Sequence, residues 1–221
     1  MPNINYEYIQ KYILSIIPDR NGILKDMEKY AEENNVPIIT PDIASLLAFL
    51  IKSLKVKSIL EIGTAIGYSA IYMGQCAGED FSITSIERNA EIADIARKNI
   101  KKAGFTDNIR VIIGNAEEIL SDINGSFDMI FVDAAKGQYI EFFNSSIDKL
   151  RIGGLFVCDN VLFRGMVAEK SLLVRRKITI VKRLKKFLSF ISSCESLQTT
   201  VIPMGDGISI SCKLKEVEII E

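Results

Sequence analysis

From Lys57 onward, short apolar runs alternate with helical stretches, and this alternation restricts the possible fold more than any other feature of the chain. Five strands are expected, at Ser58 to Ile62, Ser82 to Ile86, Arg110 to Ile113, Met129 to Val132 and Leu155 to Cys158. Helices are expected between them, most clearly over Asn89 to Ala103 and Tyr139 to Leu150. Strands that are apolar on both faces and joined by helices form a parallel sheet with right-handed crossovers. The sequence therefore predicts an α/β, doubly wound, Rossmann-like sheet with helices on both faces.

The segments on either side of this pattern complete one expected domain of 221 residues, a length that suits a single core. Residues 1–55 are predicted to be a helical cap or association surface, and residues 56–221 the Rossmann-like core. A long basic helix is expected over roughly Glu169 to Ser192. Thr199 to Ile202 and Gly207 to Leu214 flank a Pro-Met-Gly-Asp-Gly turn. They predict a C-terminal antiparallel hairpin, which brings the sheet to seven strands.

The residue composition excludes several types of catalytic and metal site. Histidine is absent, so His-based triads, His general bases and His-ligated zinc are excluded. The four cysteines form no Cys-x-x-Cys pair, which argues against a zinc knuckle or a redox pair. No uninterrupted apolar run approaches the roughly 18 residues of a membrane-spanning helix, so no membrane partner and a cytoplasmic location are expected. Acids, bases and metal ligands must come from carboxylates, amides, lysine or tyrosine.

The loop from Glu61 to Gly67 follows the first strand and opens a helix, where doubly wound folds hold a nucleotide. A dinucleotide fingerprint would have glycine at the position of Glu61, and a pyrophosphate would meet its carboxylate. S-adenosylmethionine has no phosphate and carries two positive groups, so an acidic loop suits it better. Glu87 ends the second strand, where an acidic residue accepts hydrogen bonds from ribose hydroxyls, and Ala116 follows the third, where adenine would lie. Each feature alone is common in turns and at helix caps, but together they favour S-adenosylmethionine as the cofactor.

Polar residues also follow the fourth and fifth strands. Asp133 ends one of them, and Asp159 and Asn160 end the other. On neighbouring strands these side chains converge, and three oxygen donors favour Mg²⁺, Mn²⁺ or Ca²⁺ over zinc or copper. Lys136, three residues after Asp133, is a candidate proton acceptor. The alternative is that both aspartates only cap helices.

Longer strings of residues resemble a known family. The strings are Glu61 to Ser69, Glu87, Asp133 to Tyr139, and Asp159 to Gly165. Together they resemble the metal-dependent O-methyltransferases of the catechol and caffeoyl-CoA type, over roughly residues 35–214. Within that family, Asp133 to Tyr139, Asp159 to Glu169 and Pro203 to Gly207 look most like the bacterial tRNA 5-hydroxyuridine methyltransferases.

The resemblance implies a role for each matched residue. It implies metal ligands at Asp133, Asp159 and Asn160, catalytic roles for Lys136 and Asp133, and a homodimer. The implied cofactor contacts are Ile38, Glu61, Gly63, Ser69, Glu87, Ala116 and Asp133. Ala134 and Ala135 stand where the catechol member has bulky aromatic residues, which argues against a small catechol substrate.

Two substrates fit the metal chemistry, because a catechol and the 5-hydroxyl and O4 of 5-hydroxyuracil form the same chelate. Charge favours the RNA. Nine Lys and Arg residues lie between Arg164 and Lys186 against one acidic residue, Glu169, in a chain of net charge −1. On one predicted helix, basic side chains gather on the face opposite the apolar one, and such a stripe attracts phosphates. The candidate RNA-binding residues are Arg164, Arg175, Arg176, Lys182 and Arg183.

Other interpretations stay open. The basic stripe is also compatible with a solvated surface and a small catechol-like substrate. A different class of protein, a nicotinamide-dependent oxidoreductase or a non-catalytic RNA-binding module, is opposed by Glu61 and by the intact set of Asp133, Lys136, Asp159 and Asn160.

Overall fold

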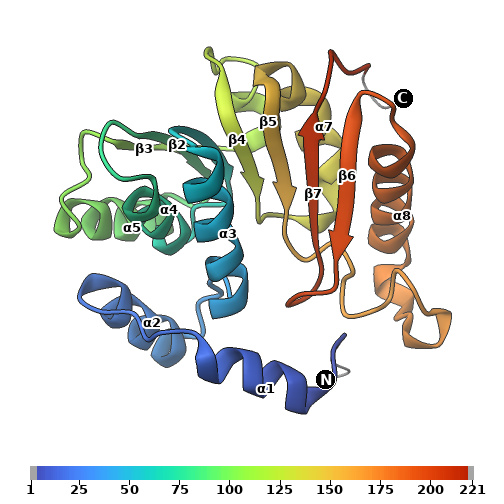
Figure 1. The fold of residues 1–221 in the computed structure, drawn as a ribbon, viewed down its shortest axis with the longest axis horizontal. Coiled ribbons are helices and arrows are strands. Elements are labelled where there is room, and N and C mark those ends of the chain that lie inside the picture. The colour runs from blue at the N-terminus through green and yellow to red at the C-terminus, as the bar shows by residue number, and fades with distance from the viewer. Residues whose placement is uncertain (1–3, 219–221) are drawn as a thin grey trace. The chain divides into compact units, whose positions relative to one another are not determined.

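The computed structural model describes residues 4–218 and contains a seven-stranded sheet of order β3-β2-β1-β4-β5-β7-β6 (Figure 1). The predicted α/β fold with a C-terminal antiparallel pair is therefore confirmed. The chain divides into two compact units. We call residues Gln10–Ala116 the N-terminal unit, and residues 4–9 with 117–218 the C-terminal unit. Each is described by itself.

The first half of the chain starts with helices and then alternates strands with helices, as the sequence predicts. Its elements are α1 (Glu7–Ile16), α2 (Ile23–Asn34), α3 (Pro41–Leu54), β1 (Ser58–Ile62), α4 (Tyr68–Ala77), β2 (Ser82–Glu87), α5 (Ala90–Lys102), β3 (Ile109–Ile113) and α6 (Ala116–Ile119). In the N-terminal unit, β2 pairs in parallel with β1 and with β3, so that Ile83 lies opposite Ile59 on one side and Ile109 on the other. Four consecutive residues of β1 are buried, which shows that both faces of this strand are covered.

Helix α5 illustrates how local sequence sets an element of this unit. The Asn89 side chain accepts hydrogen bonds from the amides of Glu91 and Ile92, which satisfies two of the first donors of the helix. Ala93, Ala96 and Ile100, spaced three and four residues apart, are its buried residues. The helix therefore presents one apolar face, as its periodicity predicts.

The C-terminal unit contains the remaining strands. Its elements are β4 (Phe127–Val132), η1 (Lys136–Gln138), α7 (Tyr139–Ser146), η2 (Ile147–Lys149), β5 (Leu150–Cys158), η3 (Lys170–Leu172), η4 (Arg175–Lys177), α8 (Ile178–Ser193), β6 (Leu197–Ile202) and β7 (Ile208–Lys213). Strand β4 pairs with β5 in parallel, whereas β7 is antiparallel to both β5 and β6. Phe143 on α7 makes edge contacts with Phe156 on β5 and with Phe187 and Phe190 on α8. These rings hold the two helices against the sheet.

The prediction of one long basic helix from Glu169 is wrong. The segment forms two short 3₁₀ turns, η3 and η4, and the helix α8 begins only at Ile178. Leu173 and Val174 are extended between the turns. Leu172 packs so close to Gly165 that a Cβ there would lie 3.0 Å from its Cδ1. The segment thus packs back against Gly165, seven residues earlier in the chain, and does not continue as one helix.

Across residues 4–218, none of the helices combines the length and the apolar character needed to cross a bilayer.

Candidate active site

The loop between β1 and α4 has a backbone that requires glycine. Gly63 and Gly67 have φ values of 105° and 86°. The amide of Gly63 donates to the carbonyl of Ile86 at 3.0 Å. A Cβ on Gly67 would lie 3.3 Å from that of Ala96, so α5 packs directly against the loop. Gly67 therefore permits the close packing of α5 on the loop, whereas Gly63 has a φ that residues with a Cβ rarely adopt.

Glu61, the acidic residue before this loop, is fully buried. Its carboxylate accepts hydrogen bonds from the hydroxyls of Ser69, at the start of α4, and of Ser85, in β2. A buried carboxylate is tolerated when it has such donors. The structure thus brings together Glu61 and Ser69, two of the expected cofactor residues. Ile38, another of them, is half-buried in the connection before α3.

Glu87 lies at the end of β2 beside the same loop. Its Oε2 accepts from the amide of Ala65 at 3.0 Å, and its Oε1 accepts from the amide of Asn89 at 2.9 Å. The end of β3 is next to it, since the amide of Gly114 donates to the Glu87 carbonyl at 2.9 Å, and Ala116 follows two residues later. The residues expected to contact ribose and adenine therefore follow neighbouring strands of the N-terminal unit.

In the C-terminal unit, Asp133 and Asp159 follow two paired strands. Val132 of β4 lies opposite Cys158 of β5, so the next residue of each strand is a neighbour of the other. The side-chain amide of Asn160 donates to Asp133 Oδ1 at 3.0 Å, and its backbone amide donates to Asp159 Oδ1 at 2.6 Å. The three residues expected to hold a metal thus form one hydrogen-bonded cluster.

Two carboxylates lie close together in this cluster, with Asp159 buried and Asp133 half-buried, and their charges are unfavourable as neighbours. Burial raises the pKa of Asp133, opposed by the charge of Lys136 and by the hydrogen bond from Asn160. Burial and the charge of Asp133 raise the pKa of Asp159 to about 7. A divalent cation would remove this penalty by neutralising both groups, and two carboxylates with an amide oxygen are donors that Mg²⁺ or Mn²⁺ accepts. Within residues 4–218, His, Cys, Asp and Glu do not gather in threes as candidate ligands, so such a site depends on the amide of Asn160.

Two residues that the sequence did not single out as site residues support this cluster. The hydroxyl of Tyr139, buried at the start of α7, donates to the backbone carbonyl of Asp159 at 2.7 Å. Asp206, between two glycines of the β6–β7 turn, is close enough that its charge contributes to raising the pKa of Asp159. Burial also raises the pKa of Asp206 itself, against the effect of the backbone amide of Arg164 and the charge of Lys136. The Pro-Met-Gly-Asp-Gly string marked this segment, but only as a turn.

The loop that follows Asp159 is strained and is held by the β6–β7 turn. Asn160, Phe163 and Arg164 have φ values of 60°, 46° and 56°, a region that residues with side chains rarely adopt. The amide of Arg164 donates to the Asp206 carboxylate. Two further backbone bonds join the loop to the turn, from Val161 to Gly207 at 2.8 Å and from Leu162 to Asp206 at 3.0 Å. Strain of this kind persists only where surrounding contacts fix it, and it is concentrated at functional sites.

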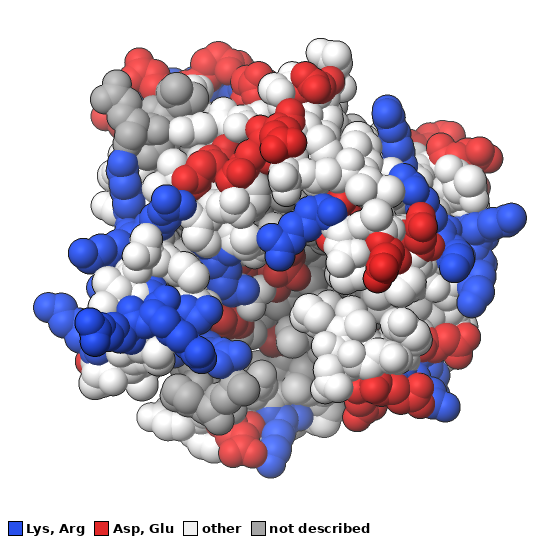
Figure 2. Space-filling model, turned by 180° about the vertical axis from the view of Figure 1, so that it is seen from behind, with Lys and Arg blue, Asp and Glu red and all other residues white. Residues whose placement is uncertain are grey.

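The expected RNA-binding residues do not form a single helix face. Arg164 lies in the strained loop, Arg175 and Arg176 in η4, and Lys182 and Arg183 on α8. Figure 2 shows Lys and Arg side chains gathered on the side of the molecule where α8 lies after the half-turn from Figure 1. Helix α8 itself contains no acidic residue, but Arg183 has a partner on another helix, since its Nη1 lies 3.3 Å from Glu141 Oε1.

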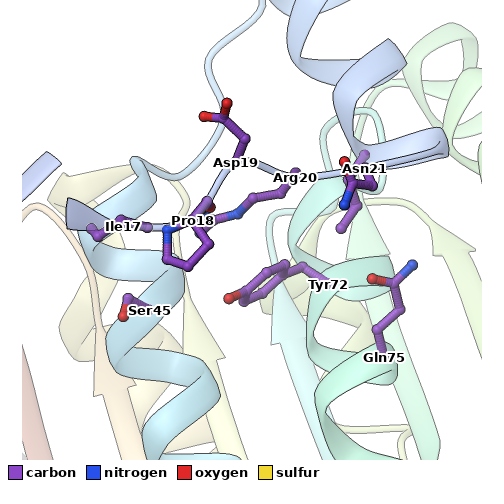
Figure 3. Close-up of a pocket in the computed structure, with 9 residues that line it drawn as sticks. Ile17, Pro18, Asp19, Arg20, Asn21, Ser45, Tyr72 and Gln75 are labelled. Carbon is purple, nitrogen blue, oxygen red and sulfur yellow. The ribbon is translucent and has the colours of Figure 1, made fainter. Parts of the chain in front are cut away.

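The N-terminal unit also contains a cavity of about 380 Å³ between α3, α4 and the α1–α2 connection (Figure 3). Arg20 crosses it, stacking over the Tyr72 ring at 5.1 Å and donating to the carbonyls of Pro18 and Pro41. The lining includes none of the expected cofactor or metal residues. The guanidinium is thus already held by these groups, and we assign the cavity no part in the candidate site.

Comparison with known proteins agrees with this geometry. The O-methyltransferase family matches residues 15–214. A caffeoyl-CoA O-methyltransferase from Stellaria longipes is 30% identical over 217 residues, covering 92% of this chain and 89% of that protein. A catechol O-methyltransferase from Niastella koreensis is 29% identical, covering 92% and 93%. A provisionally assigned caffeoyl-CoA O-methyltransferase from Staphylococcus aureus superposes with a TM-score of 0.87 at 33% identity, covering 94% and 100%.

The chain therefore belongs to the O-methyltransferase family, in the class I group that depends on S-adenosylmethionine. Within that group it is of the caffeoyl-CoA and catechol type.

Proposed function

We propose that this protein uses a divalent metal to methylate a hydroxyl group, and that its substrate is 5-hydroxyuridine in a tRNA anticodon, which becomes 5-methoxyuridine. The main support is the cluster in which Asn160 links Asp133 to Asp159 in the C-terminal unit. A buried carboxylate beside a half-buried one, both with raised pKa values, is costly unless a function needs the pair. Holding a cation is such a function.

The residues of the N-terminal unit suit S-adenosylmethionine. The Glu87 carboxylate is already fixed at the loop by two backbone amides, and its remaining lone pairs suit ribose hydroxyls. Gly63 leaves room for close approach of the cofactor. The proposed contacts are Ile38, Glu61, Gly63, Ser69, Glu87 and Ala116, with Asp133. A solved relative from Streptomyces achromogenes, 25% identical with a TM-score of 0.83, was determined in complex with this cofactor.

In the proposed reaction, the substrate oxygen attacks the methyl carbon of the sulfonium. The new O–CH₃ bond forms as the S–CH₃ bond breaks, and S-adenosylhomocysteine leaves. Mg²⁺, or Mn²⁺ or Ca²⁺, held by Asp133, Asp159 and Asn160 would lower the pKa of the hydroxyl and stabilise its anion. Lys136 accepts the hydroxyl proton in its neutral amine form. In its charged form it acts on Asp133, Asp159 and Asp206, which indicates that its side chain lies near the cluster.

Charge supports the RNA substrate. Arg175, Arg176 and Lys182 are exposed and follow the strained loop in the chain. Phosphates bound there would release counterions, which gives affinity at low salt. A small catechol-like molecule is the second candidate, because a catechol O-methyltransferase is among the relatives. The homodimer and the cytoplasmic location remain predictions that follow from the resemblance and the composition.

Methyl transfer should be measured with labelled S-adenosylmethionine, with and without EDTA. The acceptors are tRNA containing 5-hydroxyuridine, the same tRNA with uridine, and catechol. We expect metal-dependent methylation of the first tRNA and none of the second. Transfer to catechol alone would establish the small-molecule substrate, and full activity in EDTA would exclude a metal-dependent reaction.

The basic surface needs a separate test. Replacing Arg175, Arg176 and Lys182 with glutamine should weaken tRNA binding and make it less dependent on salt. The log–log slope should fall by up to about 0.7 to 0.9 for each phosphate that the variant no longer binds. A matched control replaces Lys98, Lys101 and Lys102, three exposed residues of α5, and removes the same charge. An equal fall in affinity in both variants would show that only net charge matters.

A further inference from the structure

Arg183 is directed at the segment that carries Lys136. From α8, its Nη1 donates to the carbonyl of Gly137 at 2.9 Å and lies 3.3 Å from Glu141 Oε1. These partners precede Arg183 by 46 and 42 residues. Gly137 is the residue after Lys136 in the turn η1, and Glu141 lies in the first turn of α7. One side chain thus joins three elements of the C-terminal unit.

Other contacts fix the same turn on its remaining sides. The amide of Gln138 donates to the Ala135 carbonyl at 2.9 Å, and the Gln138 side chain donates to Glu117. A Cβ on Gly137 would lie 3.6 Å from Ile180 Cγ1, which is ordinary packing distance, so α8 lies directly against the turn. Arg183 adds the polar contact from α8 to the backbone of η1. The turn is short and has no hydrogen-bonded side-chain cap of its own.

Glu141 gives a second reason to assign Arg183 to this segment. The side chains of Arg183 and Glu141 are 50% and 40% exposed, so the pair is partly desolvated. The other carboxylate oxygen of Glu141, Oε2, is buried and has no hydrogen-bond partner among the described residues. Removing Arg183 would leave this carboxylate partly buried without its cation, which is unfavourable. A phosphate that drew Arg183 away would have to compensate for the same loss.

We propose that Arg183 is a positioning residue for Lys136, and that it is not part of the RNA-binding surface. By holding the Gly137 carbonyl to α8, it fixes the backbone next to Lys136 and with it the direction of the amine toward Asp133 and Asp159. This role rests on the proposed function, in which Lys136 accepts the proton. A shift of about 1 Å in a reacting group can reduce turnover about a hundredfold, so one hydrogen bond at this place is enough to matter.

The test compares Arg183→Gln, Arg183→Lys and the matched control Lys185→Gln, which removes one charge from an exposed position on the same helix. Turnover is measured with tRNA and with an acceptor that has no phosphate, either 5-hydroxyuridine nucleoside or catechol. Arg183→Gln should lower kcat about tenfold or more on both kinds of acceptor, with KM for S-adenosylmethionine nearly unchanged. Arg183→Lys, which can still donate to Gly137, should recover part of the loss, and Lys185→Gln should behave as the wild type.

Hydrogen exchange of residues 136–138 supplies a readout that needs no activity. The amide of Gln138 should exchange at least about fivefold faster in Arg183→Gln than in the wild type, because the turn opens more often, and should not change in Lys185→Gln. Unchanged exchange would overturn the proposal. So would a higher KM for tRNA with normal turnover of the phosphate-free acceptor, which would return Arg183 to the RNA surface. A wild-type protein that methylates none of the acceptors would instead refute the proposed function, while the exchange result would still decide whether Arg183 holds the turn.

Discussion

The metal-free protein should lose stability between pH 6 and pH 8, because folding holds a proton on the Asp159 carboxyl. Its pKa rises from the ordinary value of 3.8 to about 7 in the folded state. At pH 6 the folded protein keeps this proton, whereas the unfolded chain has released it, so protonation favours the fold. The resulting stabilisation is about 1.4 kcal/mol at pH 6 and below about 0.1 kcal/mol at pH 8. Stability therefore falls as pH rises through 7 and stays level above it.

Urea unfolding in EDTA at the two pH values, compared with Asp159→Asn, measures this contribution. The amide of the variant does not titrate, its oxygen can still accept from the backbone of Asn160, and Asp133 no longer has the carboxylate of residue 159 beside it. We expect the wild type to lose about 1.4 kcal/mol and the variant less than about 0.5 kcal/mol. Saturating Mg²⁺ or Mn²⁺ should stabilise only the wild type, by about 2.7 kcal/mol at a hundred times the Kd. Equal losses for wild type and variant would refute the argument that the Asp159 carboxyl titrates near neutral pH.

Two further predictions concern the cofactor loop and the β6–β7 turn. Glu87→Gln should weaken binding of S-adenosylhomocysteine by about 1 to 3 kcal/mol, since the charged acceptor for the ribose is lost. Calorimetry should find this loss in Glu87→Gln and near-normal affinity in Asp159→Asn. Gly207→Ala should destabilise the protein by about 2 to 4 kcal/mol in urea unfolding. The added Cβ would lie 2.3 Å from Leu162 Cγ, and the φ of Gly207 is +83°. Gly125→Ala is its control, since φ is +129° there with nothing within 4 Å, and a similar cost in both variants would show that backbone conformation alone is responsible.

The strands and the strand-end acidic residues could be predicted from sequence because both depend on local pattern. Strand β1 begins and ends at the predicted residues, since an apolar run bounded by polar residues marks both ends. The closeness of Asp133 and Asp159 follows from parallel pairing, which places the ends of neighbouring strands together. Sequence spacing alone was enough for these features.

The features that sequence missed depend on contacts between distant segments. Asp206 supports the loop after Asp159 only because the β6–β7 turn packs on it. Arg183 belongs to the predicted basic stripe because its own segment contains only one acidic residue, Glu169, yet Glu141 reaches it from another helix. Periodicity within one segment carries no information about such partners.

In the strained loop after Asp159, substitutions that raise stability are expected to lower activity. Phe163 and Arg164 occupy left-handed backbone conformations that cost about 1 to 2 kcal/mol for such residues and little for glycine, whereas Asn160 tolerates its positive φ. Phe163→Gly or Arg164→Gly would relieve that cost and loosen the segment that follows a proposed metal ligand. Selection for heat resistance would therefore favour glycine here, whereas selection for turnover would retain the larger residues. A library from this chain should be screened for catalysis before thermostability, because the reverse order would select glycines that loosen the segment after Asn160, whose side chain bonds to Asp133.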